Sequence, residues 1–223
     1  MAPRPTHGQA VSAMPELSLH GFVSQIGHYA TGTVLSAMVS LASAAIFTRM
    51  FGPADYGVYV LVNTLVLFVS SFVAQAWQQP INRYLPEADD KGEQTDYLKA
   101  VILGLAWTTV LTALVAVGVR PFLSGQLLSY FIPATMLLWT QVMTAVLGTV
   151  LQARFQARSY ARLQSLSALL KLGVSVLLAL TVLASPVVIV WGAVVANAAV
   201  LPMLLLLSGA WYVITHRLPV HVP

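Results

Sequence analysis

The chain of 223 residues is 58% hydrophobic and 8% charged, contains no cysteine, and has a formal net charge of +4. Its mean hydropathy is +0.80, and soluble domains carry roughly 25% charged residues, so the composition predicts an all-α integral membrane protein. The lack of cysteine excludes disulfides, thiol catalysis and zinc–thiolate sites. The basic residues lie between apolar segments instead of forming a patch, which argues against a nucleic-acid partner.

Six apolar segments are each long enough to cross the hydrocarbon core of a lipid bilayer. We predict spans at about 25–47, 58–80, 99–119, 127–150, 163–184 and 187–213. Residues 24–214 would then form one six-transmembrane-helix bundle. Residues 1–23, rich in Pro, Ser and His, are predicted to be a cytoplasmic tail, and residues 215–223 a cytoplasmic end.

The basic residues are divided unequally between the two sides of this bundle. Only Arg49 and Arg120 fall in the first, third and fifth loops. The tail, the second and fourth loops and the C-terminal segment hold Arg4, Arg83, Lys91, Lys99, Arg154, Arg158, Arg162 and Arg217. The positive-inside rule therefore predicts a multi-pass protein with both termini in the cytoplasm.

The first two spans are joined by a short hinge with the sequence TRMFGPADYG, residues 48–57. The Gly-Pro pair is expected to stop the first helix, and the following Gly to allow a close approach of the second. An ion pair between Arg49 and Asp55 is predicted to brace the hinge. The predicted structural hinge residues are Arg49, Gly52, Pro53, Asp55 and Gly57.

Small residues recur at every fourth position of the first span: Gly32, Ser36, Ser40 and Ala44, with His28 one turn earlier. This spacing is typical of a seam where two membrane helices pack closely. The alternative is a face that lines a cavity, with His28 at its mouth.

Polar residues inside a bilayer are costly, so their arrangement is informative. The second helix carries a stripe of Gln75, Gln78, Gln79, Asn82 and Arg83. The fourth carries Gln141, Thr144, Gly148 and Gln152, and the fifth carries Gln164, Ser167, Lys171 and Ser175. The three stripes predict either a shared wet cavity that is open to the cytoplasm or hydrogen bonds between helices. Hydrogen bonding between helices is also expected for Asn63 and Asn197, with a functional role as the alternative.

Lys171 favours the cavity, because no acidic residue lies within any predicted span to pair with its ammonium group. The natural complement is a polyanionic ligand or water. The predicted substrate-binding residues are Lys171, Arg83, Gln75, Gln79, Gln141 and His28. No catalytic residue, metal site or cofactor is predicted.

Two segments carry a resemblance to a known family. The segment AAIFTRMFGPADYGVYVLVNTLVLF resembles the start of the oligosaccharide flippases of the multidrug/oligosaccharidyl-lipid/polysaccharide (MOP) exporter superfamily, and VLQARFQARSYARLQSLSALLKLGVSVLLAL resembles the basic linker between their fourth and fifth helices. The resemblance runs from about Phe22 and implies the amino-terminal lobe of a MATE-like flippase in a bacterial inner membrane. Its implied substrate is a polyprenyl-pyrophosphate-linked oligosaccharide for cell-surface polysaccharide or lipopolysaccharide synthesis. Transport would proceed by alternating access between two lobes.

Three other functions are weighed against this one. A multidrug exporter half of the same superfamily would need an acidic residue within a span, which the sequence lacks. An intramembrane enzyme is not expected, because neither a Gly-x-Ser-Gly nucleophile nor paired acids at the membrane surface are present. A structural membrane subunit without transport activity, or a truncated gene product, stays open. Because one lobe supplies half of a cavity wall, the chain alone is expected to need a second lobe or a homodimer partner.

Overall fold

The computed structural model describes residues 19–154, 157–182 and 185–215. This part of the chain is helical, and six of its helices are long and apolar enough to cross a membrane, as the sequence predicts. The helices are α2 (Leu19–Met50), α3 (Pro53–Asp90), α4 (Gln94–Val119), the 3-10 turn η1 (Arg120–Phe122), α5 (Gln126–Ala153), α6 (Ala157–Thr181), α7 (Val187–Leu207) and α8 (Ala210–Thr215).

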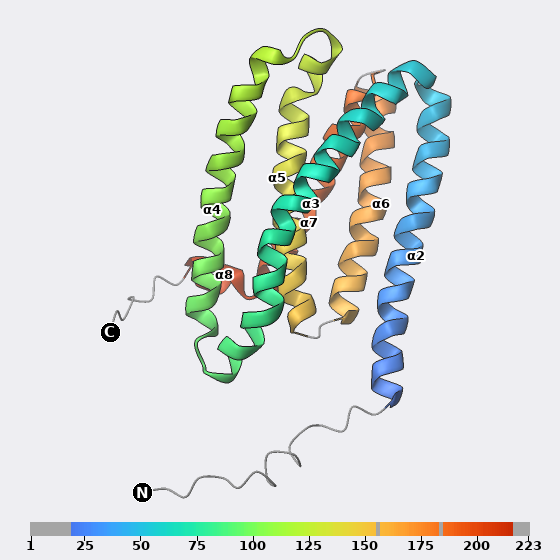
Figure 1. Cartoon of the computed structure of the whole chain (residues 1–223). Coiled ribbons are helices and arrows are strands. Elements are labelled where there is room, and N and C mark those ends of the chain that lie inside the picture. The colour runs from blue at the N-terminus through green and yellow to red at the C-terminus, as the bar shows by residue number, and fades with distance from the viewer. Residues whose placement is uncertain (1–18, 155–156, 183–184, 216–223) are drawn as a thin grey trace, which may run out of the picture.

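The six long helices run alternately up and down, and both ends of the described chain lie at the same end of the bundle (Figure 1). We call this the terminal end, and the opposite end, where α2 turns into α3, the hinge end. In α5 and α7 half of the apolar span is buried, against 11% in each of α2, α4 and α6. The bundle is therefore built around α5 and α7.

The remaining helices attach to this centre in an arc. Helix α3 packs along α5, α6 packs along α7, and α2 packs along α6, whereas α2 and α3 touch each other little. Helices α2 and α3, which are consecutive in the chain, thus have few contacts with each other, and α4 attaches to α3. The cavity described below is lined by both α2 and α3.

The turn at the hinge is made by the backbone conformation of Gly52 and Pro53. Gly52 has a φ of +69°, which a glycine adopts readily, and Pro53 begins α3. Phe47, the last buried residue of α2, packs against Val188 and Ile189 of α7 and so anchors the hinge to the centre. The predicted ion pair between Arg49 and Asp55 is not formed: the ion pairs within the described residues are Lys91–Glu87 and Lys99–Asp96.

The contact between α3 and α5 is largely apolar. Ile81 and Leu85 of α3 interlock with Val146 and Val150 of α5, all 1% exposed or less. Nearer the hinge end a second cluster, which contains Val62, Val66, Tyr130, Leu137, Val190 and Val194, joins α3 and α5 to α7. One face of α3 is therefore committed to apolar packing along most of its length.

Helices α6 and α7 approach even more closely. An added Cβ on Gly192 of α7 would lie 2.6 Å from the Cα atom of Ser175 on α6. The Ser175 hydroxyl donates a hydrogen bond to the carbonyl oxygen of Ile189 at 3.2 Å. These contacts fix the rotation of α6 and thereby decide which of its faces points away from lipid.

At the terminal end, Arg154 holds the end of α7. Its Nη1 donates a hydrogen bond to the carbonyl oxygen of Ser208 at 2.8 Å, next to Gly209, whose φ is +74°. Burial lowers the pKa of the Arg154 guanidinium, and the charge of Asp89 acts in the opposite direction. The carbonyl at the end of α7 thus has a cationic donor, and the chain turns there into α8.

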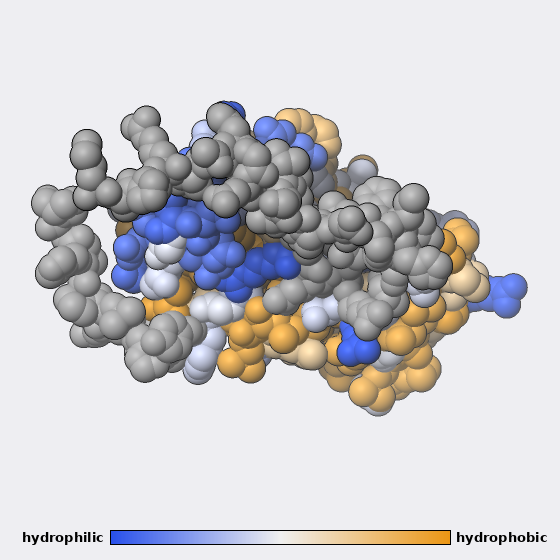
Figure 2. Space-filling model, turned by 90° about the horizontal axis from the view of Figure 1, so that it is seen from below, coloured by the Kyte–Doolittle hydropathy of each residue, from blue (hydrophilic) through white to orange (hydrophobic). Residues whose placement is uncertain are grey.

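Several helices, among them α2, α3, α4 and α6, extend beyond their predicted spans at the terminal end. Helix α3 continues past residue 80 to Asp90, and α6 begins at Ala157 instead of residue 163. The added turns are polar, and hydrophilic residues gather on this end of the molecule beside hydrophobic flanks (Figure 2). Hydropathy marks the part of a helix that lipid surrounds, while the helix itself runs on into water.

Candidate functional site

A cavity of about 620 Å³ lies between α2, α3, α5, α6 and α7. This volume falls within the range of roughly 300–1,000 Å³ that is usual for small-molecule sites. The cavity runs from the hinge end past the middle of the bundle. The polar residues that line it include Ser36, Ser40, Ser43, Asn63, Gln141, Thr144, Gln164, Ser167, Lys171 and Asn197.

Lys171 supplies the only basic side chain among the described residues that line the cavity, and no described lining residue is acidic. It lies about 15 Å along the axis from Thr181, the nearer end of α6, at about 1.5 Å per residue. No hydrogen bond or ion pair reaches it from the described residues. An ammonium group this deep attracts an anion or water, because neither hydrocarbon nor a protein carboxylate compensates its charge.

The polar stripes of α5 and α6 meet in this cavity. All four residues of the α6 stripe line it, and on α5 Gln141, Thr144 and Gly148 do so but Gln152 does not. Gln141 also accepts a hydrogen bond from the Ser70 hydroxyl of α3 at 3.0 Å. Both predicted roles therefore apply to Gln141, which joins two helices and lines the cavity.

The small-residue stripe of α2 likewise has two roles. At the terminal end Gly32 packs against Ala161 of α6, where an added Cβ would lie 3.3 Å from the Ala161 Cβ atom. Toward the hinge, Ser36, Ser40 and Ala44 line the cavity. The same stripe of α2 therefore forms a packing seam near the terminal end and a wall of the cavity nearer the hinge. The side chain of His28, a predicted substrate-binding residue, lies outside the described part of the structure.

The polar stripe of α3 does not reach the cavity. Gln75, Gln79 and Arg83 are exposed and line no part of it, and the Arg83 guanidinium lies 5.2 Å from the centre of the Tyr84 ring. The cavity therefore does not include these three residues, and their role in substrate binding stays a prediction. The apolar face of α3 that packs on α5 turns its polar stripe outward.

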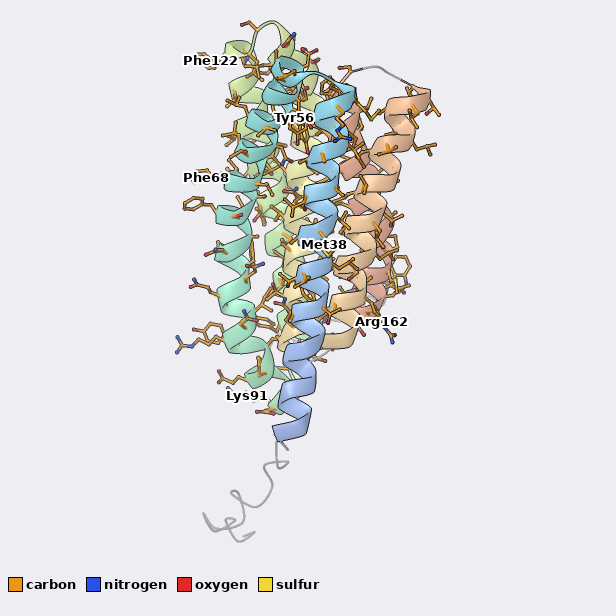
Figure 3. All side chains as sticks on the ribbon, turned by 90° about the vertical axis from the view of Figure 1, so that its right-hand side faces the viewer. Met38, Tyr56, Phe68, Lys91, Phe122 and Arg162 are labelled. Carbon is orange, nitrogen blue, oxygen red and sulfur yellow. The ribbon has the colours of Figure 1, made fainter. Side chains whose placement is uncertain are left out.

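Helix α3 contributes instead from its hinge half. Tyr56, Tyr59 and Asn63 line the cavity, and the two tyrosine rings lie 5.4 Å apart between centres. Figure 3 shows Tyr56 near the hinge end and Phe68, farther along the same helix, pointing away from the bundle. Aromatic residues near the ends of spans usually lie at the membrane interface, so the sequence gives no signal that Tyr56 and Tyr59 line a cavity.

Asn197 also lines the cavity, although the sequence favours hydrogen bonding between helices for this residue. It is 1% exposed and lies midway between Val187 and Leu207 on α7. Its amide Nδ2 donates a long hydrogen bond of 3.4 Å to the Thr140 hydroxyl, whereas its Oδ1 has no partner in the described structure. The expected bond between helices is present, but it uses only half of the amide.

A bundle of six helices long and apolar enough to cross a membrane, with an internal polar cavity, is typical of a polytopic membrane protein. The family model of the polysaccharide biosynthesis proteins matches residues 22–222. The chain therefore belongs to the polysaccharide biosynthesis protein family. Comparison with curated proteins and with solved structures found no match.

Proposed function

We propose that the chain forms one lobe of a flippase that translocates polyprenyl-pyrophosphate-linked oligosaccharide, and that Lys171 receives the pyrophosphate in the cavity. The observation that carries this proposal is the ammonium group at mid-membrane depth, facing a polar cavity with no protein carboxylate among its described lining residues. A pyrophosphate supplies the missing negative charge, and family membership supports a role in polysaccharide synthesis.

The charge of the cavity separates this function from drug export. A multidrug exporter half that binds cations would place an acidic group at the ligand, whereas the acidic residues of α3 occupy its first turn (Asp55) and its terminal end (Glu87, Asp89 and Asp90). An anionic head group is the better complement of Lys171. A non-transporting membrane subunit would have no use for an uncompensated charge at this depth.

Transport requires that the cavity be walled on the open side between α2 and α3. We propose that a second lobe, or a second copy of the chain in a two-fold dimer, completes the wall and rocks against this lobe in alternating access. The test is to reconstitute the chain, assay translocation of lipid-linked oligosaccharide, and measure its mass in detergent. Robust translocation by a strict monomer would refute the need for a second lobe.

The orientation that we propose puts the terminal end in the cytoplasm of a bacterial inner membrane, in accord with the basic residues near that end. A cysteine placed at Ala54 should react with a membrane-impermeant reagent added outside intact cells, and one placed at Gly92 should not. The reverse pattern would overturn the orientation without affecting the fold.

The binding test uses polyprenyl pyrophosphate and the full chain in lipid nanodiscs. Lys171→Gln should weaken binding about 10- to 100-fold, the range expected when a charge-assisted hydrogen bond of about 1.5–3 kcal/mol is lost. Lys171→Arg should retain most of the affinity, and Lys91→Gln, which alters an exposed lysine paired with Glu87, is the control. Equal affinities for wild type and Lys171→Gln would disprove the proposal.

A further inference from the structure

Helix α4 contacts the rest of the bundle from its terminal end as far as its middle. The indole N–H of Trp77 on α3 donates a hydrogen bond to the Thr108 hydroxyl at 3.2 Å, and the indole N–H of Trp139 on α5 donates one to the Thr109 hydroxyl. From residue 113 to residue 119, all but one of the residues of α4 are exposed. The hinge half of α4 therefore stands at the edge of the bundle with little packing of its own (Figure 1).

Helix α5 leaves an apolar face uncovered beside this part of α4. Leu128, Ile132 and Met136 lie on the helical face of Trp139, which points to α4. They are 45–58% exposed, because α4 and α5 have few contacts although they are consecutive in the chain. From Leu128 to Trp139 this face is about 16 Å long, at about 1.5 Å per residue. We call the space between this face and the hinge half of α4 the α4–α5 groove.

The inner end of the α4–α5 groove is a small hollow between α3, α4 and α5. It has a volume of about 10 Å³, and its lining includes Thr109, Thr112 and Trp139. The Thr112 hydroxyl donates a hydrogen bond to the carbonyl oxygen of Thr108 at 2.9 Å, so it is satisfied within α4. Toward the hinge, the next residue of α4 on the same helical face is Ala116. The groove thus offers a ligand apolar surface at the depth of the hydrocarbon core, which fits an acyl chain.

A basic side chain stands at the hinge end of the groove. Arg120 begins η1 directly after α4 and lies about 12 Å beyond Thr112, at about 1.5 Å per residue. Its side chain is exposed, the loop at residues 120–125 has no acidic residue, and the ion pairs of the described residues do not include it. The end of a membrane span is the level at which lipid head groups begin. A cation next to an apolar groove is complementary to an anionic lipid, whose phosphate lies at the interface and whose acyl chains lie in the hydrocarbon core.

We propose that the α4–α5 groove binds one anionic phospholipid, with an acyl chain against Leu128, Ile132 and Met136 and the phosphate at Arg120. This lipid fills the space beside the hinge half of α4 and supports a helix that has few contacts with the protein there. The site does not depend on the proposed function, because neither Arg120 nor the three apolar residues line the central cavity. It differs from ordinary contact with the bilayer, because it discriminates between lipids by charge.

The experiment measures tryptophan fluorescence, which brominated acyl chains quench on contact. The full chain is reconstituted in phosphatidylcholine vesicles with rising fractions of brominated phosphatidylglycerol, which is anionic, or of brominated phosphatidylcholine, which has no net charge. One variant keeps Trp77 and Trp139, and the other keeps Trp77 and Trp107, which is 70% exposed on the opposite face of α4. The remaining tryptophans are replaced by Phe, and a variant with Trp77 alone supplies the common background.

Phosphatidylglycerol should be preferred over phosphatidylcholine about fivefold at Trp139, the effect usual for one basic residue at an anionic membrane surface, and should not be preferred at Trp107. Arg120→Gln should remove this preference, and Arg120→Lys should keep it. Arg49→Gln, which alters an exposed arginine at the hinge end of α2, is the matched control and should change nothing. If a tryptophan variant fails to fold, native mass spectrometry of the lipids retained by the chain with all its tryptophans makes the same comparison.

Equal quenching by the two lipids at Trp139, or a preference that survives Arg120→Gln, overturns the site. Little quenching of Trp139 by either lipid, together with a dimeric mass in detergent, would mean that a second copy of the chain covers the groove, which also overturns it. Displacement of the brominated lipid by polyprenyl pyrophosphate at a lower concentration than by unlabelled phosphatidylglycerol would assign the groove to the substrate lipid and overturn the phospholipid site.

Discussion

The polar stripes of α3 and α6 look alike in the sequence, but the structure places them on opposite sides of the bundle wall. On α6, Gln164, Ser167 and Lys171 line the cavity. On α3, Gln75 and Gln79 are exposed outside it. Each stripe recurs at helical spacing, so periodicity identifies a face correctly in both cases.

The difference arises from what the opposite faces do. Helix α6 is held against α7 through Ser175 and Gly192, and its remaining polar residues turn into the space beside α2. Helix α3 is held against α5 through large apolar residues such as Ile81 and Leu85, which directs its polar stripe away from the centre. The direction of a polar face is therefore decided by the tightest contact of its helix.

The largest loss of stability is expected when the close contact between α6 and α7 is disrupted. In Gly192→Ala the new methyl would lie 2.1 Å from Ser175 Oγ and 2.6 Å from its Cα, so α6 must move away from α7. We expect a loss of about 3 kcal/mol or more, at the upper end of the cost of overpacking. Thermal unfolding in detergent, together with the yield of folded protein, measures it.

The control is Gly173→Ala on α6, where an added Cβ meets nothing within 4 Å. Both changes gain the same helix propensity, so their difference isolates the contact. Equal stability of the two variants would mean that the α6–α7 contact does not set the rotation of α6.

Much of this fold follows from the sequence. Five of the six apolar runs give one helix each, whereas the sixth predicted span, residues 187–213, is divided at Gly209 into α7 and α8. The Gly52-Pro53 pair gives the hinge, because helix ends of this kind depend on local chemistry. The cavity follows only in part. Lys171 can be identified from the sequence, because a charged group within a membrane span is energetically costly. No local sequence signal indicates that Tyr59 turns inward or that Arg83 turns outward, because these directions depend on contacts with helices that are distant in the sequence.

The second prediction compares water access on the two sides of α6. The chain has no native cysteine, so Ser167→Cys and Leu169→Cys each introduce a single thiol at nearly the same depth. Ser167 lines the cavity and Leu169 is 51% exposed on the outer surface. A water-soluble maleimide should modify Ser167→Cys at least about tenfold faster, because the reactive thiolate forms only where water reaches it. Similar rates would show that the cavity is filled with lipid instead of water.

The third prediction compares how much the polar stripes of α5 and α3 contribute to the stability of the fold. Gln141→Leu removes the acceptor of the Ser70 hydroxyl, which is then left with the Leu67 carbonyl at 3.0 Å. The expected loss is about 0.6–2 kcal/mol, the usual contribution of a hydrogen bond between membrane helices. Gln75→Leu on the exposed face of α3 should leave stability unchanged or raise it slightly. Thermal unfolding distinguishes the two, and an equal loss for Gln75→Leu would reveal a partner for the outer stripe.

The smallest effect is expected for Arg83→Gln in the binding assay with polyprenyl pyrophosphate. The Arg83 guanidinium is exposed over the ring of Tyr84 and lines no part of the cavity. Water and salt screen an exposed charge within about 10 Å, so its attraction for a phosphate at Lys171 is weak. Affinity should therefore stay within about twofold of wild type, while Lys171→Gln loses most of it. A tenfold loss for Arg83→Gln would show that the ligand also contacts the outer stripe of α3, as the sequence alone predicts. The difference between the two stripes would then apply to the packing of this lobe but not to ligand binding.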